Sequence, residues 1–354
     1  MTKNRTRRSI IVLVVLILLT IAAALVACVV GQVHATPHDV TNTILMSWGV
    51  KSDGTTPRIV TSTLWEVRFP RLVIALAVGA GLGCAGALLQ GIFANPLAEP
   101  SIIGVSSGGA VFASGLLAIA SLAGVERSYG FLKWGTALAA FIGALLTTLL
   151  VYSLSRVQGK TVVVNLILVG VAINAMAGGF VTLFSFIGGT MAQSQVVFWQ
   201  LGSLAGAGWS SAVITLIITV IGIVIACLCA PKMDLLALGE NQARHLGVNV
   251  ERFRLCVIIL VAALVGVGVA FAGVIAFVGL IVPHAIRLII GPQHKWLLPT
   301  SAFGGAFVLL VADTCARTII STAELPIGML TSLIGGPIFL LLLRRYKSVG
   351  MGWQ

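Results

Sequence analysis

The chain has 354 residues, of which 58% are hydrophobic and 9% are charged, and its mean hydropathy is +1.09. A soluble domain carries about a quarter charged residues, so this composition excludes an ordinary soluble protein and is typical of a chain that crosses a membrane repeatedly. The net charge of +12 does not indicate nucleic-acid binding, because the basic residues lie between apolar runs, where they act as topology signals.

The N-terminus carries four basic residues within its first eight positions, followed by an apolar run that ends near Val30. This run is longer than the apolar region of a signal peptide, and it lacks a small-residue cleavage site. We therefore expect residues 1–8 to form a cytoplasmic tail and the run to be a retained first span. The polar segment 31–65 then forms an extracytoplasmic loop.

Apolar segments recur along the rest of the chain, and most are long enough to cross a bilayer. They predict an all-α, polytopic membrane protein with about ten transmembrane helices and both termini in the cytoplasm. All of them belong to one transmembrane domain, residues 1–354. The expected spans are Ser9–Val30, Glu66–Gln90, Ser101–Ala123, Trp134–Leu154, Val162–Ile187, Ser210–Ala230, Leu255–Ala272, Val274–Ile290, Trp296–Ala316 and a tenth between the Ala323–Pro326 turn and the basic tail.

The basic residues test this topology. Of the 22 lysines and arginines, 15 fall in segments that the ten-span arrangement places inside, and seven fall outside. Cytoplasmic loops carry the excess of positive charge in membrane proteins, so the distribution supports the arrangement.

The stretch Val67–Gly109 contains an arginine pair, a glycine-studded span, a polar interruption and a second apolar run. Small residues in a span let helix backbones approach closely. Ordinary helix packing explains any single glycine, whereas their density favours a crowded bundle that lines a path. The polar pair Asn95 and Pro96 turns the chain back at the cytoplasmic side. The glycines concerned are Gly79, Gly81, Gly83 and Gly86.

Three arginines are expected at the outer ends of spans, against the positive-inside bias. Arg68 and Arg71 are three residues apart and share one helix face, and Arg317 ends the ninth span. They are either headgroup anchors or cations displayed to an acidic soluble partner, whose docking they would steer. Asp313 precedes Arg317 by four residues, so we expect this pair to form a structural ion pair.

The longest inside segment, residues 231–254, has the pattern of a short amphipathic helix with several leucines at helical spacing. A simple connection between two spans has no use for exposed leucines, whereas a docking element for a cytosolic partner does. A helix that lies on the lipid headgroups is the alternative.

Several chemical functions are disfavoured. Gln158–Thr161 resembles the end of a phosphate-binding loop, but Leu154 stands where the first glycine is needed, so we reject ATP binding there. Asp313 is the one acid expected well inside a span, which argues against an intramembrane enzyme and a proton-coupled transporter. His284, after Pro283, is expected to pack near a broken helix. The six cysteines are read as small core residues, with no metal site.

With these motifs in view, the chain resembles the permease subunits of type II ABC importers, the group that carries ferric siderophores, heme and cobalamin. The resemblance covers most of the chain from the second span onward. It is carried by VRFPR (Val67–Arg71), AGALLQGIFANPLAEPSIIGVSSGG (Ala85–Gly109), LALGENQARHLGV (Leu236–Val248), AGVIAFVGLIVPHAIRL (Ala272–Leu288), QHKWLLP (Gln293–Pro299) and ADTCAR with AELPIG (Ala312–Gly328).

The resemblance implies a homodimer in a bacterial cytoplasmic membrane, with the path at the interface between subunits. It also implies two cytosolic ATPase subunits and an extracytoplasmic solute-binding protein. In such permeases Arg68, Arg71 and Arg317 would pair with acidic residues of the binding protein. The helix that couples to the ATPase would contain Ala237, Leu238, Gly239, Glu240, Ala243, Arg244 and Gly247.

The chain itself is then not an enzyme and needs no cofactor, since Mg-ATP would bind the partner ATPase. Heme or another iron chelate is the expected cargo, and cobalamin is the alternative. An ion-gradient-driven secondary transporter is the alternative from another class. One departure concerns the cytoplasmic gate, where some family members place small hydroxyl residues and this chain has Val163, Val164 and Asn165.

Overall fold

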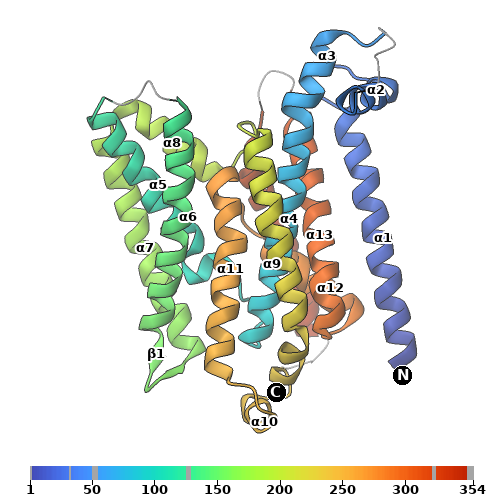
Figure 1. Cartoon of the computed structure of the whole chain (residues 1–354). Helices are drawn as coiled ribbons and strands as arrows, with labels where there is room; N and C mark the ends of the chain where they lie inside the picture. Colours follow the sequence, from blue (N-terminus) through green and yellow to red (C-terminus); the bar gives the residue numbers. More distant parts are fainter. Residues whose placement is uncertain (1, 32, 50–54, 125–128, 321–323, 349–354) are drawn as a thin grey trace.

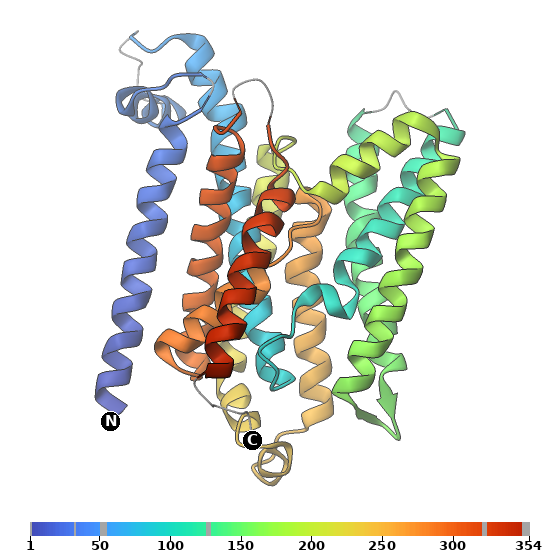
Figure 2. The ribbon, with the colours of Figure 1, turned by 180° about the vertical axis from the view of Figure 1, so that it is seen from behind.

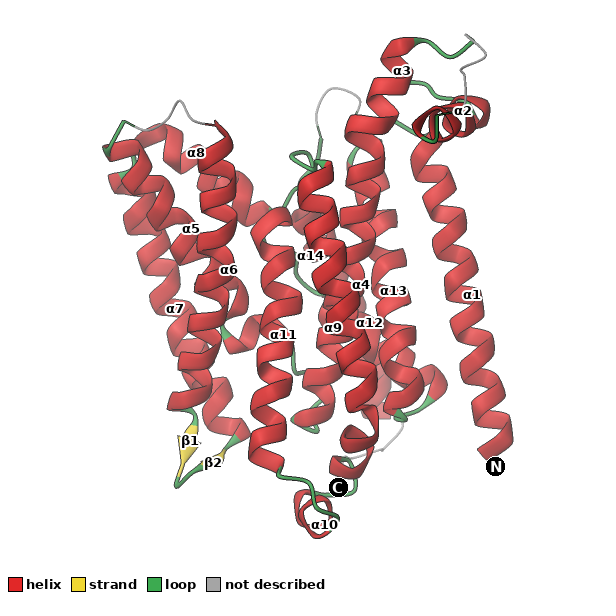
Figure 3. Ribbon diagram, in the orientation of Figure 1, coloured by secondary structure: helices red, strands yellow, loops and turns green. Residues whose placement is uncertain are grey.

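The structure, a computed structural model, describes residues 2–31, 33–49, 55–124, 129–320 and 324–348. Most of these residues are helical, and a short β-hairpin contains the only strands among them (Figure 3). The elements are α1 (Thr2–Val29), α2 (Pro37–Ser47), α3 (Arg58–Ser62), the π-helix η1 (Thr63–Arg68), α4 (Phe69–Ile92), the 3₁₀-helix η2 (Pro100–Ile103), α5 (Val105–Leu122), α6 (Tyr129–Leu154), β1 (Arg156–Val157), β2 (Lys160–Thr161), α7 (Val163–Ile187), α8 (Gly189–Leu201), α9 (Trp209–Leu236), α10 (Glu240–His245), α11 (Val250–Ala272), α12 (Val278–Ile290), α13 (His294–Ala316) and α14 (Ile327–Ser348).

The predicted fold class is confirmed. Each of the ten expected spans falls on a helix, and within the described residues eight helices are long and apolar enough to cross a membrane. The other two expected spans correspond to the shorter apolar helices Val278–Ile290 and Ile327–Leu342.

Some boundaries differ from the prediction. The expected third span is interrupted at Gly104, whose φ of 82° separates η2 from α5. The eighth begins at Val278 rather than Val274, after a non-helical segment. The outer loop contains α2, which starts with a capping box in which the Thr36 hydroxyl accepts from the Asp39 N–H.

The β-hairpin lies between α6 and α7, in the connection between two expected spans, and it was not predicted. Arg156 pairs with Thr161 and Val157 with Lys160. Gln158 and Gly159 both have positive φ, 49° and 78°, as a two-residue hairpin turn of type I′ requires. This conformation has no resemblance to a strand-to-helix phosphate loop.

Helix α4 is the centre of the bundle (Figure 1). In its most apolar stretch, 78% of the residues are buried, against 11% for α1, so α4 is enclosed while α1 exposes most of its surface. Helices α9, α11, α12 and α13 surround α4, and α1 leans on α13 at one flank. Helices α5, α6 and α7 form the opposite flank, and α8 crosses over their end.

The four glycines of α4 named from the sequence have backbone atoms of neighbouring helices as their nearest neighbours. A Cβ on Gly79 would meet the carbonyl group of Gly305, one on Gly83 that of Ser301, and one on Gly86 that of Gly279. Gly81 faces the Leu264 carbonyl oxygen, 3.3 Å from the position of a Cβ. The close packing of α4 against α13, α12 and α11 therefore requires glycine at these positions, because a side chain would overlap the neighbouring backbone.

The two ends of the bundle differ. The hairpin, α10, the start of α1 and the end of α14 lie at one end (Figures 1 and 2). Helices α2, α3 and α8 lie at the other end. The predicted inside and outside elements therefore separate to opposite ends.

Candidate functional site

Helix α10 is a separate element beyond the inner end of α9. The prediction of one amphipathic helix through this segment was wrong, because the helix breaks at Gly239, whose φ is 117°. A second glycine with positive φ, Gly247, follows α10. Residues with a Cβ rarely adopt these angles, so the two glycines allow α10 to fold back across the end of the bundle.

The predicted leucine face is divided by this break. Leu236 and Val248, which flank α10, are buried and anchor it. Ala243 lies within α10 and is fully buried. Leu238 and Leu246 are 64% and 59% exposed and point away from the bundle. The remaining residues predicted to couple to an ATPase are solvent-exposed or are the two glycines that flank α10: Ala237, Gly239, Glu240, Arg244 and Gly247.

A buried arginine connects α10 with α11. The Nη2 of Arg254 is 2.6 Å from Glu240 Oε1, and its Nη1 is 3.4 Å from Glu251 Oε1. Arg254 is 2% exposed, so its charge depends on these two carboxylates. Arg244 makes a looser pair with Glu240, at 3.6 Å and near the surface.

A second polar contact fixes the end of α9. Asp234 Oδ1 accepts from the backbone N–H of His294 at 2.9 Å and lies 2.7 Å from His294 Nδ1. The His294 ring is 1% exposed and lies against Gly91, near the end of α4. Asp234 therefore connects the helix that precedes α10 to the start of α13.

The three outer arginines are buried in the chain itself rather than displayed on its surface. Arg68 donates to the carbonyl oxygens of Cys28, Val29 and Val33 at the end of α1. Arg68 is 6% exposed. The exposed arrangement that the docking interpretation implied is therefore not found at Arg68, because polar groups of α1 and the following loop cover the guanidinium, and docking itself stays a prediction.

Arg71 and Arg317 share one buried carboxylate. Asp313 Oδ1 is 2.9 Å from Arg71 Nε, and Asp313 Oδ2 is 3.5 Å from Arg317 Nε. Arg71 Nη1 also lies 2.8 Å from Glu324, whose side chain is 38% exposed. The predicted Asp313–Arg317 pair is confirmed, and the cluster joins α4, α13 and the segment before α14.

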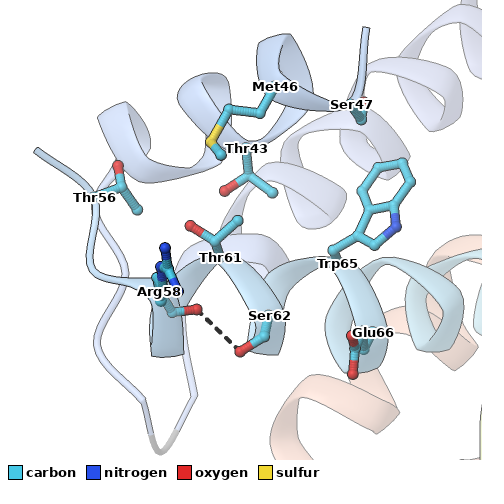
Figure 4. Close-up of a pocket in the computed structure, with 9 residues that line it drawn as sticks. All are labelled: Thr43, Met46, Ser47, Thr56, Arg58, Thr61, Ser62, Trp65 and Glu66. Atoms are coloured by element: carbon cyan, nitrogen blue, oxygen red, sulfur yellow. Dashed lines mark hydrogen bonds between the residues drawn. The ribbon is translucent and has the colours of Figure 1, made fainter. Parts of the chain in front are cut away.

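A groove of about 860 Å³ opens at the outer end, between α2 and the helix formed by α3 and η1 (Figure 4). Thr43 and Met46 of α2 face Thr61 and Trp65 across it, with Arg58 at one end. The Trp65 ring packs against Trp209 with centroids 5.0 Å apart, and the Trp209 indole donates to the Trp65 carbonyl oxygen. Tryptophans of this kind mark the level of the membrane–water interface.

A polar recess of about 430 Å³ lies between α5, α7 and α8. The Ser107 hydroxyl donates to Asn174 Oδ1 at 2.6 Å, and the Asn174 amide donates to the Ser101 carbonyl oxygen at 3.1 Å. Thr182 and Gln200 also line the recess. Polar groups at membrane depth face protein or water rather than lipid, so this side of the bundle adjoins a solvated space or a partner.

The loop after α4 reaches the start of α12. Asn95 Oδ1 accepts from the Leu97 N–H at 2.9 Å, and Pro96 lies in the same turn. Glu99 accepts from the Phe277 N–H at 3.1 Å, and burial raises the pKa of the Glu99 carboxyl. Pro283 and His284 are buried inside α12.

Sequence reasoning missed Glu99, Asp234, Glu251, Arg254 and His294. Their partners are 14 to 178 residues away, apart from the Glu251–Arg254 pair. The amphipathic pattern near Leu235 pointed to the region, and the available signal for a pairing requirement was an arginine, Arg254, directly before an apolar run.

Comparison with known proteins now adds to this geometry. The model of the FecCD transport family matches residues 12–345. A hemin transport system permease protein, HmuU of Yersinia pestis, is 40% identical over 291 residues, covering 82% of this chain and 85% of the relative. A cobalamin import system permease protein, BtuC of Halobacterium salinarum, is 40% identical over 278 residues, covering 78% and 72%.

A solved structure described as an inward-facing metal-chelate type ABC transporter superposes with a TM-score of 0.78. It is 32% identical in sequence, and the match covers 94% of this chain and 98% of that one. The fold and the two polar ends therefore define a permease subunit of an ABC importer. The chain belongs to the FecCD transport family.

Proposed function

We propose that two copies of this chain form the channel of an ATP-driven importer that moves an iron chelate, heme foremost, across a bacterial cytoplasmic membrane. The observation that carries this proposal is α10, a short helix held between two glycine hinges with Leu238 and Leu246 exposed at the inner end. Exposed leucines at the two ends of a protruding helix suit insertion into an apolar groove of a cytosolic partner.

The driving force comes from that partner. Two ATPase subunits bind α10 and its hinges, and Mg-ATP is hydrolysed on them rather than on this chain. The clamp between Glu240 and Arg254 keeps α10 at a fixed angle to α11, so a push on α10 moves the spans behind it. The polar recess of α5 and α7 borders the path, which closes against the second copy.

Cobalamin is the second candidate cargo, since a cobalamin permease matches at the same 40% identity as the hemin permease. Uptake measurements in proteoliposomes that contain the permease, the ATPase and an extracytoplasmic binding protein distinguish heme from cobalamin. We expect ATP-dependent uptake of heme that cobalamin does not compete away. Uptake of cobalamin alone would replace heme as the cargo, and uptake without the ATPase would indicate an ion-gradient-driven transporter.

The outer arginines remain our candidates for docking the binding protein. Because Arg71 is already paired, an acidic partner must compete with Glu324, the more exposed of its two carboxylates. Glu324→Gln removes that competitor and leaves Asp313 in place, so it should strengthen binding-protein association, more at low salt. Surface plasmon resonance on the reconstituted permease measures this, and unchanged or weaker association would reject the role of Arg71.

A further inference from the structure

Among the elements that the structure describes, α10 and the β-hairpin project at the inner end, and a groove separates them (Figure 1). A groove of about 440 Å³ lies between them, lined by Gln158 and Lys160 of the hairpin and by Arg244 and Glu251 on the other side. Any mechanical connection between the two elements must therefore run around this groove.

Such a connection exists in a chain of charged contacts. Glu240 at the start of α10 holds Arg254 of α11 at 2.6 Å, and Arg254 contacts Glu251 at 3.4 Å. The other oxygen of Glu251, Oε2, accepts from the Thr161 hydroxyl at 2.8 Å and from the Thr161 N–H at 3.2 Å. Thr161 is the last residue of β2, and α7 begins two residues later.

The inner part of this series of contacts is buried. Arg254 is 2% exposed, Thr161 is 8% exposed and the Glu251 side chain is 20% exposed, so water does not readily replace their partners. The Glu240 side chain, at the α10 end of the series, is 46% exposed. Each carboxylate holds more than one donor, which fixes the orientation of its oxygens.

We propose that Glu240, Arg254, Glu251 and Thr161 form a relay that carries the movement of α10 to the hairpin and so to the start of α7. This inference rests on the proposed function, in which α10 receives the push of an ATPase. Helix α7 carries Asn174 and Thr182 of the polar recess, so a displacement of its first turn changes the path. Arg254 and Glu251 are positioning residues in this scheme, since neither touches the cargo.

The relay has a sharp test, because Thr161 can be altered with matched controls. Thr161→Val removes the hydroxyl donor to Glu251, whereas Thr161→Ser keeps it. Thr148→Val is the matched control, since Thr148 is also buried but its hydroxyl donates to Ala144 within α6. Glu251→Gln tests the same link from its other side.

In proteoliposomes with both partners, we expect Thr161→Val and Glu251→Gln to lower the cargo moved per ATP about fivefold or more, the range of an allosteric coupling. ATPase binding should be retained, and Thr161→Ser and Thr148→Val should behave as wild type. An unchanged ratio in Thr161→Val and Glu251→Gln would overturn the relay, as would an equal loss in Thr148→Val.

A measurement without partners separates this inference from the proposed function. Spin labels are attached to non-canonical amino acids introduced at positions 158 and 241. Pulsed electron paramagnetic resonance then measures the distance between the hairpin and α10 in the permease alone. We expect the distance distribution to broaden in Thr161→Val and to stay narrow in Thr161→Ser and Thr148→Val. A distribution that stays narrow in Thr161→Val rejects the relay, even if ATP-dependent uptake by the wild type is demonstrated.

Discussion

Asp313 holds two arginines with one buried carboxylate. Replacing it by asparagine keeps the shape but leaves Arg71 with Glu324 as its acidic partner and removes the acidic partner of Arg317, which keeps the Ala27 carbonyl oxygen. Breaking a buried pair by removing one partner costs about 3–5 kcal/mol. We therefore expect Asp313→Asn to lower the thermal unfolding midpoint in detergent strongly.

Glu324→Gln is the control for this prediction. Its carboxylate is 38% exposed, so its loss should cost less than about 1 kcal/mol. If both variants lowered the unfolding midpoint equally, the buried position of Asp313 would not be what matters.

At the residue scale, the sequence predicted local pairs and missed distant ones. The i,i+4 spacing was enough to predict the Asp313–Arg317 pair. Arg71 and Asp313 are 242 positions apart, and Arg68 pairs with carbonyl oxygens that any residue supplies. The arginines were therefore read as exposed, because a sequence does not show which buried acceptors will surround a cation.

Among the helices, α4 is expected to be the least tolerant of added atoms. In Gly86→Ala, the new methyl group would overlap the Gly279 carbonyl group, which cannot rotate away as a side chain can. Overpacking against backbone should cost about 3 kcal/mol or more. Thermal unfolding and yield of folded protein in detergent measure the effect.

Gly178→Ala in α7 is the matched control. Nothing lies within 4 Å of a Cβ at Gly178, and alanine favours a helix interior by about 0.5–1 kcal/mol over glycine. This variant should be as stable as wild type or slightly more so. Equal destabilisation by both substitutions would show that helix contacts of α4 are not the cause.

At the element scale, apolar runs predicted where helices exist, because hydrophobic length is a strong local signal. The breaks were harder to predict. Gly104 and Gly239 are two glycines among 40, and their positive φ angles follow from tertiary contacts that a sequence does not display. Helix α2 was missed although Thr36 and Asp39 carry its capping signal, since the surrounding segment is polar.

For the whole molecule, topology is the property to test. Trp48 is 79% exposed at the outer end, and Leu246 is 59% exposed at the inner end. In intact cells, a membrane-impermeant maleimide should label Trp48→Cys and not Leu246→Cys, and permeabilised cells should label both. Wild-type protein, whose six cysteines lie within helices, supplies the background. Labelling of Leu246→Cys in intact cells would invert the arrangement.

Within the described residues, the bundle has a recess with polar side chains from α5 and α7 and an apolar groove lined by α1, α4, α9 and α13. The sequence did not show which side chains line either space, because each is assembled from distant segments. Motifs of the FecCD family allowed the importer class and Glu240 to be predicted, whereas Arg254, Glu251 and Thr161 emerged only from contacts in the structure.

The π-helix η1 joins the outer helix α3 to α4 within one continuous helix, Arg58–Ile92. A wide turn of this kind accommodates an extra residue in an otherwise regular helix. Deleting one residue there would restore α-helical bonding and remove the wide turn, without rotating the flanking helices by the full ~100° per residue of an α-helix. The wide turn thus sets the directions of Trp65, which packs on Trp209, and of Arg68, which reaches the end of α1.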